Sequence, residues 1–439
     1  MQVRKQHIKY RLVHVVCVAL ACSSVCCSAD SAEVVIIDSM SGLQVSGGKA
    51  DAFLNISIPV DFPAAQDLAV IFPLRTQGGI RGDSQTVDGR TLLPQEWIEA
   101  ITAAYADTVV EDAIQRENQY EDWRLVSVRF APCGPLGHHF GQSPETLCWP
   151  QVRLVWQPIM EDLMVLWTRP FFGDDRAIHA LYHVMPESGA VASLTEVQGH
   201  LERGGELSTL PVGLYDTFIA DRNAALERWI RLLLDLRTPG QPPGKNLDVR
   251  TELNTMDTTV SGEFTERLNR VLSVTALAEH LFDLTSFSLP EGRDAPQIDL
   301  WSFVAFDMGA DGELQQRTLL VRSPVDGRII GDAGLDETVT MTGADDELAS
   351  WRQEGALAEE LTSFVVFSAD TQPFLRETIN DPQQVLVPNT SCASCHRLNE
   401  TRFDFHMLSH LEDNDTTIAP RVVNDVRHEL QWLRNALGR

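Results

Sequence analysis

Trp123-Arg124-Leu125-Val126-Ser127-Val128-Arg129-Phe130 and Gln151-Val152-Arg153-Leu154-Val155-Trp156 are the two stretches from which the fold of this chain is best approached. Each is short and rich in β-branched and aromatic residues, which favours a β-strand. Cys133 follows the first stretch and Cys148 precedes the second. We therefore expect two strands joined by a long hairpin loop, with one cysteine near each end of that loop.

The two hairpin cysteines are expected to form a disulfide bond, because the N-terminus predicts export to an oxidising compartment. Basic residues between Arg4 and Arg11 precede a short apolar run, Leu12–Ala21, as in a secretory signal peptide. Closing a loop of this size stabilises a fold by roughly 3 kcal/mol in the chain-entropy model. The run is too short to remain as a membrane-spanning helix.

Two fates of the signal segment remain open. Cleavage after Ala29 would remove residues 1–29 and with them four cysteines, leaving Cys133, Cys148 and a second pair further on. Alternatively, Val18-Ala19-Leu20-Ala21-Cys22 is similar to a bacterial lipobox, and a lipid on Cys22 would then be the one expected membrane contact. The even number of remaining cysteines favours cleavage. Both fates place the mature chain in the periplasm or on the outer surface of a bacterium.

Working outward from the hairpin, we expect an α+β protein. A helix is predicted from Pro94 to about Gln115, a third strand over Arg176–Met185 and a helix over Asn223–Leu236. His179 and His183 would share one face of that third strand, where we interpret them as structural residues. The run Thr238-Pro239-Gly240-Gln241-Pro242-Pro243-Gly244 is typical of a linker. We place a domain or subdomain boundary there.

The second half repeats the order of elements of the first. A helix over Phe264–Phe282 would precede strands at Ile298–Phe306 and Arg317–Val321. We therefore predict an α+β domain over residues 30–240, a second, similar α+β domain or subdomain over residues 247–385, and a short α-helical haem segment over residues 386–439. Residues 30–385 contain no G-x-S-x-G, H-E-x-x-H, phosphate-loop or dinucleotide motif, so the sequence assigns them no catalytic role.

The haem segment is predicted from Ser391-Cys392-Ala393-Ser394-Cys395-His396, which has the C-x-x-C-H pattern of covalent haem c attachment. Positions three and four apart lie on one face of a helix, so Cys392 and Cys395 can bind one porphyrin while His396 ligates its iron. We expect one covalently bound haem c per chain. A thiol redox pair and half a zinc site are the alternatives considered for this motif.

This segment resembles a c-type cytochrome over residues 386–439. Besides the motif, it ends like one, with an amphipathic helix after Pro420. The apolar stripe of this helix consists of Val423, Val426, Leu430, Leu433 and Leu437. Small soluble members of that family bring a distal Met from much farther on, whereas this chain ends 43 residues after His396. The candidates for the second iron ligand are, in order, His406, Met407 and His410.

Charge limits the partners of this protein. The formal net charge is −27, and such a surface repels nucleic acid and anionic lipid and suits a redox partner with a basic docking surface. The favoured function is electron transfer by an exported mono-haem cytochrome. Two alternatives stay open: a haem enzyme or sensor with an open or displaceable sixth position, peroxidase-like or gas-binding, and a non-haem binding protein whose C-x-x-C forms a disulfide.

Overall fold

The structure is a computed structural model that describes the fold in separate stretches of the chain. They are residues 58–73, 86–106, 120, 123–136, 148–160, 172–173, 177–189, 191–202, 209–240, 243–255, 257–288, 302–309, 312–317, 320–322, 329–332, 418 and 420–438. The expected signal segment, residues 1–29, and its lipobox cysteine Cys22 lie outside these stretches.

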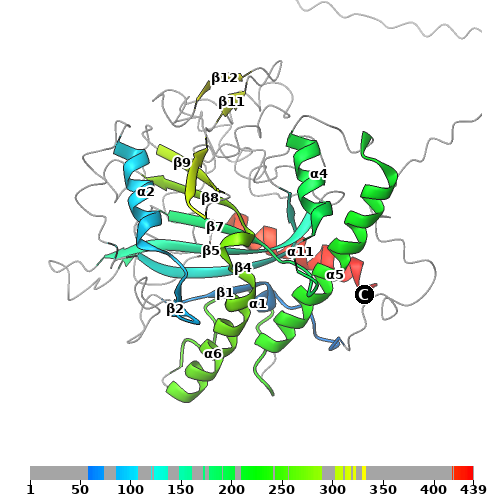
Figure 1. Cartoon of the computed structure of the whole chain (residues 1–439). Helices are drawn as coiled ribbons and strands as arrows, with labels where there is room; N and C mark the ends of the chain where they lie inside the picture. Colours follow the sequence, from blue (N-terminus) through cyan, green and yellow to red (C-terminus); the bar gives the residue numbers. More distant parts are fainter. Residues whose placement is uncertain are drawn as a thin grey trace, which may run out of the picture. The chain divides into compact units, whose positions relative to one another are not determined.

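An antiparallel sheet organises the described residues (Figure 1). Its seven main strands, in spatial order, are β1 (Ala69–Ile71), β4 (Trp123–Pro135), β5 (Cys148–Met160), β7 (Ala177–His183), β8 (Leu281–Ser288), β9 (Ser302–Met308) and β10 (Leu314–Arg317). The short β6 (Phe172–Gly173) also pairs with β5. Two small pairs stand apart from it: β2 (Thr86–Val87) with β3 (Arg90–Thr91), and β11 (Leu320–Arg322) with β12 (Ile329–Asp332). With its helices the fold is α+β, as the sequence predicts.

The two halves of the chain contribute to this one sheet, so the expected division into two α+β domains is wrong for the described strands. β7 pairs with β8 directly, with Ala180 opposite Leu284. The predicted helix over Phe264–Phe282 is also wrong at its end, because α6 (Thr258–Thr275) stops earlier and a single turn, η5 (Ala278–His280), leads into β8. In β8, successive residues point to opposite faces of the sheet, and residues of both faces are buried, as expected for a central strand.

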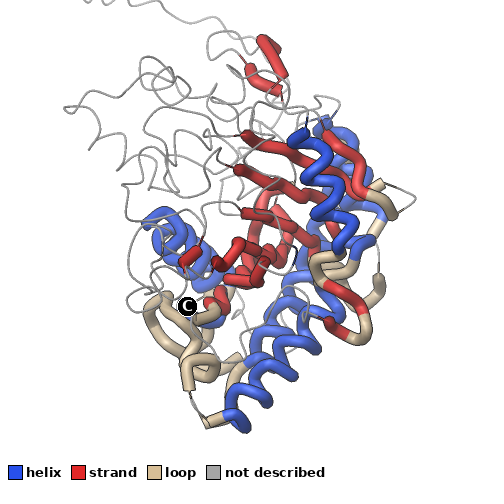
Figure 2. The backbone as a smooth tube through the Cα atoms, turned by 90° about the vertical axis from the view of Figure 1, so that its left-hand side faces the viewer, coloured by secondary structure: helices blue, strands red, loops and turns tan. Residues whose placement is uncertain are grey.

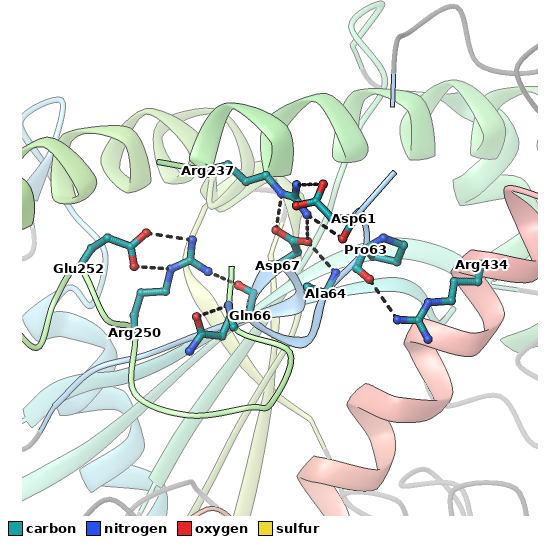
Figure 3. A network of polar contacts seen from close by, with 10 residues as sticks. Asp61, Pro63, Ala64, Gln66, Asp67, Arg237, Arg250, Glu252 and Arg434 are labelled. Carbon is teal, nitrogen blue, oxygen red and sulfur yellow. Dashed lines mark hydrogen bonds and ion pairs between the residues drawn. The ribbon is translucent and has the colours of Figure 1, made fainter. Parts of the chain in front are cut away.

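Polar contacts hold the two ends of the expected linker against the start of the described chain (Figure 3). Arg237 pairs with Asp67 at 2.6 Å and with Asp61 at 3.0 Å. The backbone N–H of Gly244 donates to Gln66 Oε1 at 2.8 Å, and a Cβ on Gly244 would lie 2.6 Å from the Gln66 side chain. A side chain at position 244 would have to displace the end of Gln66 and break this hydrogen bond, so the chain on either side of residues 241–242 is tied to the start of the described chain.

One face of the sheet, here called the apolar face, carries the core. Its members are Val70, Val128, Phe130, Val152, Leu154, Trp156, Ile178, Ala180, Tyr182, Leu284, Val304 and Phe306. Three helices pack on these side chains: α2 (Gln95–Ala106), α5 (Val212–Leu236) and α6. The sequence predicts the second half of α5, whereas the first half, with α4 (Ala192–Glu202), forms a smaller apolar cluster around Trp149 and Phe218.

The opposite face, here called the polar face, consists of the alternate positions of the same strands. Its polar members are Ser127, Arg129, Gln151, Arg153, Gln157, His179, His183, Asp283 and Thr285. The C-terminal helix α11 (Pro420–Ala436) lies on this side, away from α5 and α6 (Figure 2). The expected apolar stripe of α11 is confirmed at Val426, Leu430, Leu433 and Leu437, but Val422 rather than Val423 is its first buried residue.

Candidate functional site at the polar face of the sheet

The residues predicted to hold the haem lie outside the described part of the chain. These are Cys392, Cys395 and His396, together with the candidate second ligands His406, Met407 and His410. The nearest described elements are Ile418 and α11, which follow the haem segment in the sequence. What α11 contacts therefore fixes where the C-terminal end of that segment is anchored.

Helix α11 is anchored on the polar face by ion pairs with Arg129. The guanidinium of Arg129 lies 3.5 Å from Asp425 Oδ2 and 3.0 Å from Glu429 Oε1. The two acids are four residues apart and so lie on one face of the helix. At the start of the helix, Val422 packs with Ile71 of β1 in a small apolar contact that includes Ile418. Charge and burial together hold α11 on this side of the sheet.

A second arginine makes these ion pairs necessary. Arg129 and Arg153 stand directly opposite each other on β4 and β5, and like charges in such positions repel. Burial, and then the charge of Arg129, lower the pKa of Arg153, whereas the acids Asp425, Glu429 and Asp283 oppose that shift. Burial alone would also lower the pKa of Arg129, but attraction to Glu429 and Asp425 outweighs it and the net shift is upward. The helix thus supplies the counter-charges of this face.

The two histidines of β7 differ in their surroundings. His183 is buried, its ring is stacked on Phe282 with centroids 3.9 Å apart, and the edge of Trp149 lies 6.5 Å away. Burial, and then the neighbouring His280, lower the pKa of His183 to about 3. The imidazole is therefore neutral at physiological pH. Among the described residues its Nε2 has no hydrogen-bond partner.

Helix α5 carries a buried arginine, Arg222. Arg222 is 3% exposed, and its terminal nitrogen donates to Asn223 Oδ1 at 3.3 Å. Burial lowers its pKa, and the one group that opposes the shift is the side chain of Tyr215. Its Nε has no hydrogen-bond partner among the described residues. A guanidinium in such surroundings favours an anion.

The predicted disulfide is present in the structure. Cys133 on β4 and Cys148 on β5 are joined, with their Cα atoms 4.8 Å apart. The bond closes the hairpin where Pro135 pairs with Cys148 and Gly134 with Trp149. It therefore fixes the end of β5 from which Trp149 contacts His183.

Comparisons of this chain with protein-family models, with curated proteins and with solved structures found no match. Within the described stretches, no helix is long and apolar enough to cross a membrane. The same stretches contain no group of three or more His, Cys, Asp or Glu side chains placed to hold a metal ion.

Sequence reasoning missed Arg129, Arg153 and Arg222, and it assigned His183 a structural role. Arg129 and Arg153 occupy alternate positions of strands that are covered on both faces of the sheet. In the sequence, this alternation of polar and apolar residues resembles that of an ordinary strand with one face exposed to solvent. The spacing of Asp425 and Glu429 on an amphipathic helix is the one signal that points to a cationic partner. Nothing in the sequence names that partner.

Proposed function

We propose that the protein is an exported mono-haem c-type cytochrome that acts in electron transfer. The observation that carries this proposal is the sequence Cys392-Ala393-Ser394-Cys395-His396, in which two thiols and an imidazole have the spacing of covalent haem attachment. Cys392 and Cys395 would hold the porphyrin, and His396 would be the axial ligand on the same side.

The disulfide of the hairpin supports the proposal independently. Haem c attachment and stable structural disulfides both belong to compartments outside the cytoplasm, and Cys133 is bonded to Cys148. Such a compartment is what the basic and apolar N-terminal residues predict. A cytosolic zinc or thiol redox role for C-x-x-C is correspondingly disfavoured.

In this proposal the chain's own residues bind, orient and shield the cofactor. The haem, when bound, supplies reversible one-electron chemistry at its iron. The sheet and its helices would serve as the partner-binding or anchoring part of the protein. The acidic composition, with a net charge of −27, favours a partner with a basic docking surface.

The test is to produce the full chain in cells with a haem c attachment system and to record its pyridine haemochrome spectrum. We expect one covalently bound haem per chain, lost in the Cys392→Ala/Cys395→Ala variant and kept in the control His428→Ala on α11. Exported, folded protein without covalent haem would overturn the proposal. Covalent haem that persists in the double cysteine variant would overturn the attachment site.

Carbon monoxide separates electron transfer from the haem enzyme or sensor alternative. A six-coordinate iron resists the ligand, whereas an open sixth position admits it. We expect the ferrous protein to bind carbon monoxide slowly or not at all. Rapid binding by the unmodified protein would contradict the electron-transfer proposal and favour the haem enzyme or sensor alternative.

A further inference from the structure

The imidazole of His183 can take up a proton, yet it is enclosed by groups that favour its neutral form. The ring of Phe282 is stacked on it with the centroids 3.9 Å apart, and the ring of Trp149 lies 6.5 Å away in an edge arrangement. The residue opposite His183 on β5 is Gln151, a neutral amide. His183 is 3% exposed. Burial of this kind removes water from the ring, and the cost falls mainly on the charged form.

The charged groups near this ring do not compensate an imidazolium. Burial is the main reason that the pKa of His183 falls to about 3, and the neighbouring His280 lowers it further. The pKa of His280 is lowered by burial, with Glu279 opposing that shift and Arg228 and Arg90 adding to it. Nε2 of His183 has no hydrogen-bond partner in the described stretches. A proton on His183 would therefore meet positive charge and apolar rings.

The two residues that follow His183 hold this end of the sheet together and connect it to α5. The carbonyl oxygen of Val184 accepts a hydrogen bond from Nε1 of Trp149 at 2.9 Å. The carbonyl oxygen of Met185 accepts one from the Arg228 guanidinium at 2.7 Å. Because both acceptors lie within two residues of His183, a displacement of its backbone would disturb both hydrogen bonds.

The smaller apolar cluster, here called the α4–α5 cluster, meets the sheet at the same residues. Trp149 packs against Phe218 of α5 with the ring centroids 5.5 Å apart, and Met185 belongs to the cluster as well. Arg222, one turn after Phe218, is buried and its Nε has no hydrogen-bond partner among the described residues. A small cluster next to an unpaired buried cation opens at a lower cost than the main core.

We propose that His183 is an acid-sensitive switch that controls the attachment of the α4–α5 cluster to the sheet. At neutral pH the uncharged ring packs against Phe282 and Trp149. When the ring takes up a proton from solvent, the imidazolium leaves this apolar setting for water. Val184 and Met185 move with it, and the cluster opens. The inference goes beyond the proposed function and needs no haem, so either proposal can fail without the other.

The sign of the effect follows from the difference in proton binding between the closed and open states. The pKa of about 3 in the closed state lies below the ordinary value of 6.5, so the open state binds the proton first as the pH falls. The closed state keeps its full stability above pH 6.5 and loses it below that value. The opening constant should rise by about tenfold for each pH unit below 6, until the pH approaches 3.

The main test is hydrogen exchange of the full-length protein, followed by mass spectrometry of peptides from α4, α5 and α6 at pH 7, 6 and 5. The parent is compared with His183→Phe, which keeps a buried ring that cannot be charged. The ratio of their opening constants cancels the pH dependence of the exchange chemistry. For α4 and the first half of α5, this ratio should rise by about tenfold between pH 6 and 5. The control His200→Phe, at an accessible position of α4, should behave like the parent.

Two results would overturn the switch. The first is the same pH dependence of exchange in the parent and in His183→Phe. The second is an equal rise in α6, which packs in the main core, because acid would then unfold the whole protein and not the α4–α5 cluster.

A second variant and a second measurement keep the test decisive if His183→Phe does not fold. His183→Gln also lacks the titrating ring, and it should give the same ratio against the parent. Nitrogen-15 spectra of histidine-labelled parent should show an imidazole that stays neutral at pH 5 and is missing from the spectrum of His183→Gln. If every histidine of the parent is charged at that pH, the imidazolium is tolerated in the closed state and the proposal is wrong.

Discussion

The two faces of the sheet are buried in different ways. On the apolar face, aliphatic and aromatic side chains pack against α2, α5 and α6. On the polar face, arginines, histidines and acids are buried or half-buried, and α11 satisfies part of their charge. Burial of apolar surface is favourable wherever the shapes fit, whereas buried charges are retained only where partners are supplied. The apolar face therefore explains why the chain folds, and the polar face is where a specific function is expected.

The largest effect is expected from a cavity in the apolar face. Trp156 is fully buried at the centre of β5. Trp156→Ala should lower the free energy of unfolding by about 3–5 kcal/mol, because it removes a large apolar contact and leaves a void. Denaturant unfolding followed by circular dichroism measures the change. The control Val212→Ala, at a position 78% exposed, should stay within about 0.5 kcal/mol of the parent. A similar loss in both variants would contradict the assignment of the core.

The strands of the hairpin show how far sequence could predict this fold. Strands β4, β5 and β7 and helix α11 follow from local pattern, because their residues repeat at the strand or helix period. The end of α6 does not, because Leu281–Ser288 suits a helix or a strand until its neighbours are known. The pairing of this segment with β7 makes it a strand. The linker shows the same limit, since the contacts of Arg237 with Asp61 and Asp67 join residues far apart in sequence.

The candidate site was harder to predict than the fold. Cys133 and Cys148 could be paired from compartment and parity, and the structure bears this out. Arg129 could not be matched with Asp425 and Glu429, because some 300 residues separate them and no local pattern records the contact. The unpartnered Nε2 of His183 is likewise a property of its surroundings. The haem motif itself, Cys392 to His396, stays a prediction from sequence.

The disulfide should stabilise both faces of the sheet, because it fixes the hairpin that carries Val152 on the apolar face and Arg153 on the polar face. Cys133→Ala/Cys148→Ala should lower the free energy of unfolding by about 3 kcal/mol, since it frees a loop with a sequence separation of 15 in the unfolded state. The parent measured with a reductant should match the variant. Equal stability of oxidised and reduced parent would show that the bond does not hold the hairpin.

A somewhat smaller effect is expected from the ion pairs of the polar face. Arg129→Met leaves Asp425 and Glu429 without their cation and should cost about 2–3 kcal/mol, below the value for a fully buried pair because these side chains are 9–16% exposed. Adding Asp425→Asn and Glu429→Gln should recover much of the loss. The control Arg427→Met, on the exposed side of α11, should change little. Failure of the triple variant to recover stability would mean that packing, and not charge, anchors α11.

The smallest effect is a pH dependence of the same contact. Burial raises the pKa of Glu429 above its ordinary value of 4.5, and the attraction of Arg129 opposes this shift without reversing it. Asp425 and Arg153 are the other charged groups that act on it. Because the unfolded carboxyl loses its proton at a lower pH than the folded one, the contribution of Glu429 to stability is complete below pH 4.5. It falls as the pH rises from there through the folded pKa, and is constant above it.

The variant Glu429→Gln lacks this titration, so the parent should lose stability relative to the variant as the pH rises from 4.5 toward neutrality. Denaturant unfolding of both proteins at several pH values measures the difference. If the parent instead gains stability relative to Glu429→Gln over that range, the ion pair with Arg129 outweighs desolvation. In that case the ionised form of Glu429 would stabilise the folded protein. The raised pKa of Glu429 implies instead that the attraction of Arg129 offsets only part of the cost of burying this charge.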